Sequence, residues 1–170
     1  KLPADKISLT EATIDKITEI TPCNTSKVSI FENAYQHLIQ YELIINERIA
    51  ALRTHIAQEN IQAFIIPSTD PHLSEYVAPH WQSREWISGF TGSAGTVVIT
   101  AEEAGLWTDS RYFLQAARQI EGTEITLYKE MLPETPSIPA FLNSRLQEGD
   151  IVGIDGKCSR PKKWSICKKH

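Results

Sequence analysis

The sequence has little cysteine, a single methionine and no long apolar run. The three cysteines, Cys23, Cys158 and Cys167, are odd in number and scattered, which excludes a disulfide framework and is typical of reduced thiols in an intracellular protein. We therefore expect a cytoplasmic location. The only methionine is Met131. Because the chain does not begin with methionine, we expect it to be a segment, a processed product or an incomplete part of something longer.

Membranes and nucleic acids are poor candidates for partners. No apolar run approaches the roughly 18–20 residues that span a bilayer, and residues 1–5 lack the apolar stretch of a signal peptide. Positive charge is not in excess either, since 17 Lys and Arg stand against 21 Asp and Glu, a net charge of −4. We therefore expect neither nucleic acid nor an anionic membrane as a partner. Apolar residues make up 41% of the chain, which is enough for a globular core.

Metal-ligating residues are too sparse to predict a metal site in this chain. Cys158, Cys167 and His170 lie near one another in the sequence but lack the fourth ligand and the tight spacing of a structural zinc site. His72 and Glu75 form an H-x-x-E pair, for which His80 is an unsupported third ligand. A polar surface or capping role is the favoured interpretation of that pair, and we expect no metal ligands here.

The chain changes character near residue 45. Residues 1–44 contain two helical patterns, at 8–20 and from Val28, and are interpreted as a helical extension or linker of unknown role. From residue 45 onward, apolar residues recur at the spacing of one buried helix face. This face comprises Ile45, Ile49, Leu52 and Ile56. We therefore predict two parts, residues 1–44 and a domain over residues 45–170.

The domain alternates between strand and helix patterns. Strands are expected at residues 61–66, 96–100, 106–108, 125–128 and 151–154, with 96–100 and 106–108 forming an antiparallel hairpin. Helices are expected at 70–76, at 83–88, from Asp109 or Ser110, from Ser137 to Gly149, and from Pro161. This order predicts an α/β fold, a mixed β-sheet flanked by helices on both faces. Trp107 and Phe113 are expected in its core.

Three glycines, Gly89, Gly92 and Gly95, lie in the segment SGFTGSAG at residues 88–95. Their spacing does not match a phosphate-binding loop, and the segment leads into a predicted strand instead of a helix N-terminus. Ser93 is not in a G-x-S-x-G nucleophile elbow either. We interpret these glycines as allowing a tight turn and close backbone packing.

Arg111 is the strongest candidate for binding a ligand. It follows a predicted strand and is expected in the first turn of a helix, at the edge of an α/β sheet where ligands bind. A cation there opposes the helix dipole, so structure alone does not explain it. Its planar guanidinium suits a carbonyl or carboxylate of a substrate. A surface ion pair with Asp109 is the alternative, and the residues alone leave both open.

Four motifs together carry a family resemblance. They are PSTDPH at 67–72, SEY at 74–76, REWISGFTGSAGT at 84–96 and WTDSRYFLQA at 107–116. In this order they resemble the creatinase-type N-terminal domain of Xaa-Pro aminopeptidases, the aminopeptidase P family. The resemblance runs from about residue 45 to residue 157 and does not cover residues 1–44.

The resemblance implies a non-catalytic domain of a metallopeptidase. In the family, a separate catalytic domain holds two divalent metal ions, usually manganese, and hydrolyses the bond before a proline at the second position of a peptide. The domain seen here shapes the active-site entrance and takes part in subunit contacts, typically of a homodimer. The motif W-T-D-x-R-Y marks Arg111 as a substrate-binding residue, and no residue of this chain is expected to be catalytic. Two alternatives are a stand-alone peptide- or protein-binding module and an interaction fragment that works through residues 1–44.

Overall fold

The computed structural model describes residues 25–72, 74 and 76–154. The chain divides into two units, residues 1–38 and residues 39–170, and the sheet and its core belong to the second. The predicted helices at 8–20 and from Pro161, and the cluster of Cys158, Cys167 and His170, lie outside the described residues. Division of the chain at residue 44 stays a prediction.

Five strands and five helices make up the described part of the chain. In chain order they are α2 (Thr25–Gln58), β1 (Ala63–Pro67), the 3-10 helix η1 (Pro79–Trp81), α3 (Ser83–Ser88), β2 (Thr96–Thr100), β3 (Ala104–Thr108), α4 (Phe113–Gln119), β4 (Ile125–Lys129), α5 (Ile138–Arg145) and β5 (Val152–Ile154). Within these described residues, no helix is both long enough and apolar enough to cross a membrane.

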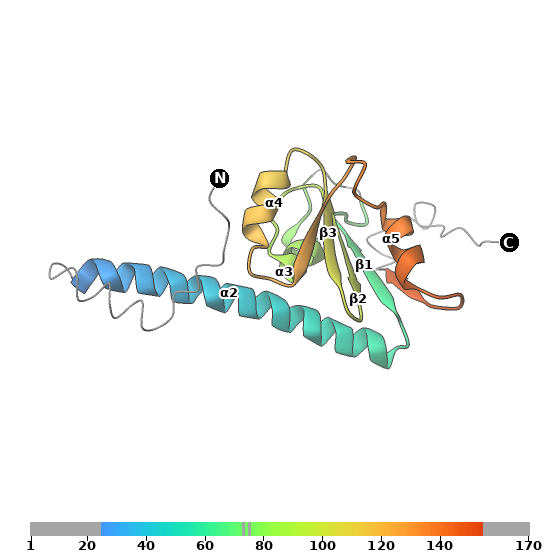
Figure 1. The fold of residues 1–170 in the computed structure, drawn as a ribbon, viewed down its shortest axis with the longest axis horizontal. Helices are drawn as coiled ribbons and strands as arrows, with labels where there is room; N and C mark the ends of the chain where they lie inside the picture. The colour runs from blue at the N-terminus through green and yellow to red at the C-terminus, as the bar shows by residue number, and fades with distance from the viewer. Residues whose placement is uncertain (1–24, 73, 75, 155–170) are drawn as a thin grey trace. The chain divides into compact units, whose positions relative to one another are not determined.

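The strands form one mixed sheet in the order β4-β3-β2-β1-β5. Figure 1 labels its three central strands, β3, β2 and β1. β2 is antiparallel to both of its neighbours, with Ile65 opposite Val98 and Val97 opposite Leu106. β4 and β5 are added in parallel at the two edges, beside β3 and β1. The predicted hairpin and the mixed sheet are therefore confirmed.

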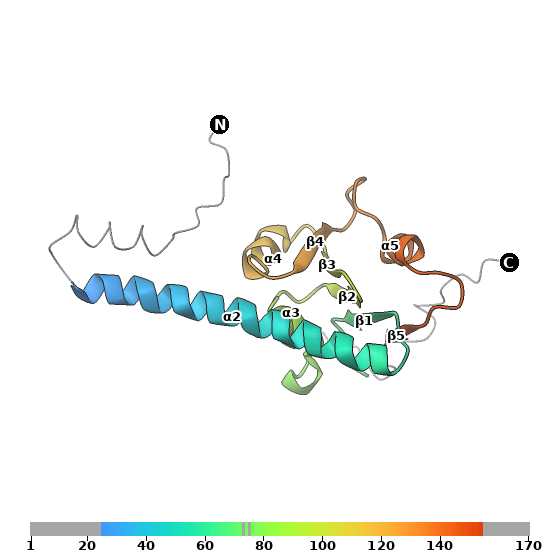
Figure 2. The same ribbon diagram turned by 60° about the horizontal axis from the view of Figure 1, so that its bottom comes forward.

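Helices cover both faces of this sheet (Figure 2). One face packs against α2, α3 and α4, through Ile45, Ile49, Ile87 and Ala116. The other face packs against α5. Successive side chains of a strand point to opposite faces. Because helices cover both faces, the side chains on each face are apolar. The predicted flanking of the sheet on both faces is confirmed.

The buried face predicted for the helix after residue 45 is confirmed. Ile45 and Ile49 are fully buried, Ile56 is 5% exposed, and Leu52 packs against the same core. The apolar residues at these positions recur on one side of α2 because an α-helix has 3.6 residues per turn.

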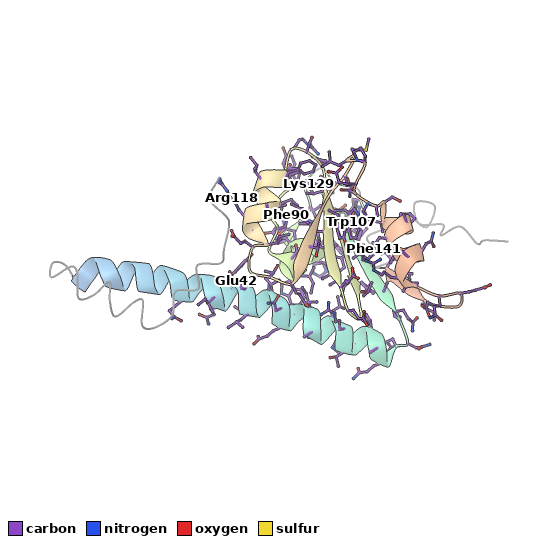
Figure 3. All side chains as sticks on the ribbon, in the orientation of Figure 1. Glu42, Phe90, Trp107, Arg118, Lys129 and Phe141 are labelled. Atoms are coloured by element: carbon purple, nitrogen blue, oxygen red, sulfur yellow. The ribbon has the colours of Figure 1, made fainter. Side chains whose placement is uncertain are left out.

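The second core cluster is built around Trp107, which is 1% exposed. Its ring stacks on Tyr128 with 4.1 Å between centroids and meets Phe141 of α5 edge-on at 5.0 Å (Figure 3). The indole Nε1 donates a hydrogen bond to the Pro136 carbonyl at 2.9 Å. The predicted core position of Trp107 is confirmed.

Phe113 was also predicted in the core, and this was wrong. It is half-buried, because it is the first residue of α4 and lies at the margin of the helix, with Lys129 Nζ 5.6 Å from its ring. The fully buried residue of α4 is Ala116, one turn further along.

The helix predicted at 70–76 was also wrong. The described residues there form a turn at 71–72, and Tyr76 is 86% exposed. Asp70 Oδ1 does accept the His72 and Ser74 amides, at 3.0 and 2.9 Å, as a cap would, but here these bonds hold a turn. So short a segment forms a stable helix only where tertiary packing supports it.

Helix α5 begins as predicted and ends earlier. The Ser137 hydroxyl accepts the Ala140 amide at 3.3 Å, which is the predicted N-cap. The helix ends at Arg145, with Leu146 as its C-cap, so Gly149 does not terminate it. Gly149 lies in the turn before β5 with φ of 99°, a conformation that glycine adopts readily.

Candidate functional site

One edge of the sheet gathers the candidate residues. β1, β3, β4 and β5 run in one direction, so Pro67, Thr108, Lys129 and Ile154 end at the same edge. The loop of residues 89–95, here called the glycine loop, joins α3 to β2 and reaches this edge because β2 runs the opposite way. The carboxyl edge of such a sheet is where ligands of α/β proteins bind.

Arg111 lies at this edge in a turn, not in the first turn of a helix as predicted. The Tyr112 amide donates to the Asp109 carbonyl at 3.0 Å, which closes a turn over residues 109–112. Helix α4 begins only at Phe113, and its N-cap Tyr112 makes no side-chain capping bond. The expected opposition between Arg111 and the helix dipole therefore does not apply.

The Arg111 side chain is exposed and oriented by Asp109. Its Nε and Nη2 donate to the two oxygens of Asp109 at 2.9 and 2.7 Å, while 67% of the side chain stays accessible. The Arg111 amide also donates to Oδ1 at 3.0 Å. The hydrogen bond from Arg111 holds the pKa of Asp109 below its usual range and raises that of Arg111, so both groups are charged at neutral pH. This is the ion pair considered from sequence; the substrate-binding role of Arg111 stays a prediction.

The glycine loop bends at residues 93–94 and leads into a strand, not a helix. Gly89 has φ of 69°, a left-handed conformation that ends α3, and its carbonyl accepts a hydrogen bond from Tyr41 at 3.1 Å. A Cβ placed on Gly92 would lie 2.2 Å from Cζ of Phe90, which is fully buried. The loop leads into β2, and the predicted close packing at these glycines is confirmed, whereas the loop contains bends at residues 93–94 and not a hydrogen-bonded turn.

Tyr112 connects the glycine loop with Arg111. Its hydroxyl and the Ser93 hydroxyl share a hydrogen bond of 2.7 Å, which lowers the pKa of Tyr112. The Tyr112 ring meets Phe90 edge-on, with 5.8 Å between the centroids. Arg111 Cζ lies 5.3 Å from the centre of the same ring. Tyr112 therefore contacts the glycine loop and also lies beside the guanidinium that Asp109 orients.

A second polar contact ties the same loop to α4. The Thr91 amide donates to Gln119 Oε1 at 3.1 Å, and the Thr91 hydroxyl accepts from both Gln115 and Gln119 at 2.9 Å. These amide side chains are neutral and partly accessible. The surface beside Arg111 therefore offers both hydrogen-bond donors and acceptors, which suits a peptide backbone.

Arg84 braces the glycine loop from inside. It is only 6% exposed, and its guanidinium donates to the carbonyls of Phe90, at 2.6 Å, and Gly92. Burial lowers the pKa of Arg84 to about 10, with the charge of Glu85 opposing the shift. Arg84 also lines a cavity of about 310 Å³ together with Ser93, and Arg111 is not among the residues around that cavity.

No ligand set for a metal ion is formed by the described residues. Within 25–72, 74 and 76–154, no three His, Cys, Asp or Glu side chains come together in a way that could hold an ion. His72 is exposed and Glu75 lies outside the described residues. This part of the chain does not fit the pair of metal ions that the resemblance assigns to the family.

The structure brings together residues that the sequence analysis left without a role. Arg84 and Tyr112 were quoted only as parts of motifs. A signal for Arg84 exists, because the carbonyls of a tight glycine-rich turn have no strand partners and need a nearby donor. The contact between Ser93 and Tyr112 has no comparable signal, since the two residues are 19 positions apart.

Known proteins match this arrangement over most of the chain. The family model of the Creatinase/Prolidase N-terminal domain matches residues 48–167. Xaa-Pro aminopeptidase 2 of Rattus norvegicus is 48% identical over 108 residues, which are 64% of this chain and 16% of that protein. Xaa-Pro aminopeptidase ApepP of Drosophila melanogaster is 41% identical over 124 residues, 72% of this chain and 20% of that protein. The chain thus spans a fifth or less of the length of these relatives.

A solved structure agrees with the family model and with these relatives. The X-prolyl aminopeptidase of Caenorhabditis elegans, described as a cytosolic enzyme with a di-nuclear active site, superposes with a TM-score of 0.65 at 34% identity. The superposition covers 70% of this chain and 21% of that one. With the family model matching more than half of its residues, this chain belongs to the Creatinase/Prolidase N-terminal domain family.

Proposed function

We propose that this chain is the non-catalytic N-terminal domain of a Xaa-Pro aminopeptidase, a metallopeptidase that releases the residue ahead of a proline. The observation that carries the proposal is 41–48% identity to Xaa-Pro aminopeptidases across the domain. The relatives have most of their length outside the matched region. In this proposal the catalytic groups belong to that further length, and the present domain shapes the entrance to the active site.

Arg111 is the proposed contact with substrate. Its guanidinium is charged, 67% accessible and held at the ligand-binding edge of the sheet. A planar guanidinium binds carbonyl and carboxylate oxygens with two donors at once. In a peptide with proline at its second position, the part that begins with the proline is the leaving group. Its carbonyl and carboxylate oxygens are the ones that Arg111 would bind.

The remaining parts of the proposal concern the metal ions, the assembly and the location. Two divalent ions, usually manganese, are held by the catalytic domain and supply the activated water. The proposed enzyme is a homodimer and is cytoplasmic, and the C. elegans relative described as cytosolic supports the location. Exposed aromatic side chains, Tyr76 at 86% and Trp86 at 56%, support contacts with other domains or subunits.

The chain alone is expected to be inactive. Purified residues 1–170, supplied with Mn²⁺ and an Xaa-Pro dipeptide, should give no more hydrolysis than buffer with Mn²⁺, because the described residues offer no ligand set for an ion. Release of the amino acid is measured by chromatography. Metal-dependent turnover by the chain would contradict the proposal. Binding of the peptide without turnover, measured by calorimetry, would favour the stand-alone binding module.

Arg111→Ala in the full-length aminopeptidase carrying this domain is expected to lower kcat/KM. The corresponding loss of transition-state stabilisation is ~1–3 kcal/mol, the scale of a lost hydrogen bond to a charged group. Steady-state kinetics on an Xaa-Pro peptide measures the change. Arg118→Ala is the matched control, because Arg118 is an exposed arginine in the last turn of α4, at the end of that helix away from Arg111. Equal kinetics for the two variants would leave Arg111 with only its surface ion pair.

A further inference from the structure

We propose that Arg84 is a positioning residue for the Arg111 site, holding the glycine loop in the conformation that fixes Tyr112 beneath the Arg111 guanidinium. The inference rests on the proposed function, since it assumes that Arg111 contacts substrate. Arg84 itself is buried and does not touch substrate in this account.

The environment of Arg84 is costly for a cation. The side chain lies over the Phe90 ring, with 4.8 Å from Cζ to the ring centre, and Nε is buried without a hydrogen-bond partner. None of the ion pairs among the described residues includes Arg84. A buried cation with unsatisfied hydrogen-bonding capacity destabilises a fold compared with an apolar side chain of similar size. Its presence therefore calls for a role that an apolar side chain cannot fill.

That role is the simultaneous bonding of two loop carbonyls. Nη1 donates to Phe90 O and Nη2 to Gly92 O, so one planar group fixes both ends of a three-residue stretch. The two terminal nitrogens of a guanidinium keep a fixed separation and direction. A lysine ammonium carries all of its donors on one nitrogen and cannot reproduce this geometry. Arg84 therefore sets the conformation of the loop as well as its stability.

The stretch that Arg84 fixes and the next residue, Ser93, contact Tyr112 at three places. Phe90 meets the Tyr112 ring edge-on, Ser93 shares a hydrogen bond with its hydroxyl, and Gly92 leaves so little room that an added Cβ would lie 2.8 Å from Tyr112 Cδ1. Because protein interiors are close-packed, a shift of the loop displaces the ring.

Tyr112 passes this position on to Arg111. The two residues are adjacent, the Arg111 guanidinium lies 5.3 Å from the Tyr112 ring centre, and the Tyr112 amide closes the turn that also contains Asp109. A displaced Tyr112 therefore moves the surface against which Arg111 rests. A misplaced binding group weakens substrate binding without any change in its own chemistry.

A double-mutant cycle in the full-length aminopeptidase tests this coupling. Arg84→Lys keeps the charge and removes the fork, and we expect it to lower kcat/KM about tenfold, mainly by raising KM. In an Arg111→Ala background the same change should cost less than about twofold, because the group being positioned is already gone. Tyr112→Phe, which removes only the hydroxyl bonded to Ser93, should show the same coupling and serves if Arg84→Lys does not fold.

Arg53→Lys is the matched control for a general loss of stability. Arg53 also donates to a backbone carbonyl, Thr100 O at 2.9 Å, and to Glu124, but Thr100 is the end of β2 opposite the glycine loop. We expect Arg53→Lys to lower the melting temperature without raising KM, whereas Arg84→Lys raises KM at temperatures well below its own melting temperature.

The outcomes separate the two claims. Equal losses from Arg84→Lys in both backgrounds, or no loss in either, would overturn the positioning role and leave the role of Arg111 intact, provided that Arg111→Ala lowers kcat/KM. If Arg111→Ala has no effect on kcat/KM, the proposed substrate contact fails, and the positioning role fails with it.

Discussion

Replacing Trp107 with alanine is expected to lower the free energy of unfolding by about 3–5 kcal/mol, the range for truncating a buried aromatic residue. Trp107 belongs to β3, and its ring contacts Tyr128 and also Phe141 of α5 (Figure 3). Truncation removes both aromatic contacts, opens a cavity on this face of the sheet and leaves the Pro136 carbonyl without its indole donor. Urea unfolding followed by circular dichroism should show a lower midpoint with little change in slope.

Two further variants make the Trp107 result specific. Trp107→Phe keeps a ring in the cluster and loses the indole N–H, so its loss of stability should be smaller. Phe113→Ala should cost less than Trp107→Ala, because Phe113 is half-buried at the start of α4. An unchanged urea midpoint for Trp107→Ala, or a larger cost for Phe113→Ala, would contradict the packing of this face.

Gly92→Ala is expected to destabilise the domain by about 3 kcal/mol, the upper part of the range for overpacking. The new methyl group would lie 2.2 Å from Phe90 Cζ and 2.8 Å from Tyr112 Cδ1, and Phe90 has no exposed surface toward which it can move. Relief requires the glycine loop to move, which strains the two hydrogen bonds from Arg84. Thermal and urea unfolding both measure the loss.

Gly149→Ala separates steric overlap from backbone strain. Gly149 has φ of 99°, yet nothing lies within 4 Å of the position its Cβ would take. Its substitution should cost only the conformational penalty of a positive φ, on the order of 1–2 kcal/mol. A cost for Gly92→Ala no greater than that for Gly149→Ala would show that the loop has room to adapt.

The fold could be predicted from the sequence because its main signals are periodic. Ile45, Ile49 and Ile56 recur at helix spacing and are buried in the structure. The β-branched run at 96–100 and the short turn after it predict the antiparallel pair of β2 and β3. Such patterns repeat over several residues, so an error at one position does not change the conclusion.

The starts of α3 and α5 were predicted correctly, but the helices expected after Asp70 and Asp109 were not, because such starts depend on single contacts. Asp109 is a residue type that often caps a helix. Here its carboxylate bonds the Arg111 side chain and amide instead, and the helix begins four residues later, at Phe113. Asp70 does bond amides two and four residues on, and still the described residues after it form only a turn.

The candidate site was only partly predictable for a related reason. Arg111 stands out by its position after a strand, which is local information. The contacts of Tyr112 with the glycine loop join residues about 20 positions apart, and nothing in a single sequence specifies them. Arg84 was missed because a charged residue in a short helix is normally exposed.

The pairing of Arg111 with Asp109 has a consequence for how a ligand would be selected. The guanidinium already holds an anion bound through two donors, so an incoming oxygen exchanges with or adds to an existing partner instead of neutralising a bare charge. Long-range attraction for negatively charged molecules is small at such a balanced pair. Discrimination then depends on shape and hydrogen-bond direction, which suits a neutral peptide backbone better than a free anion.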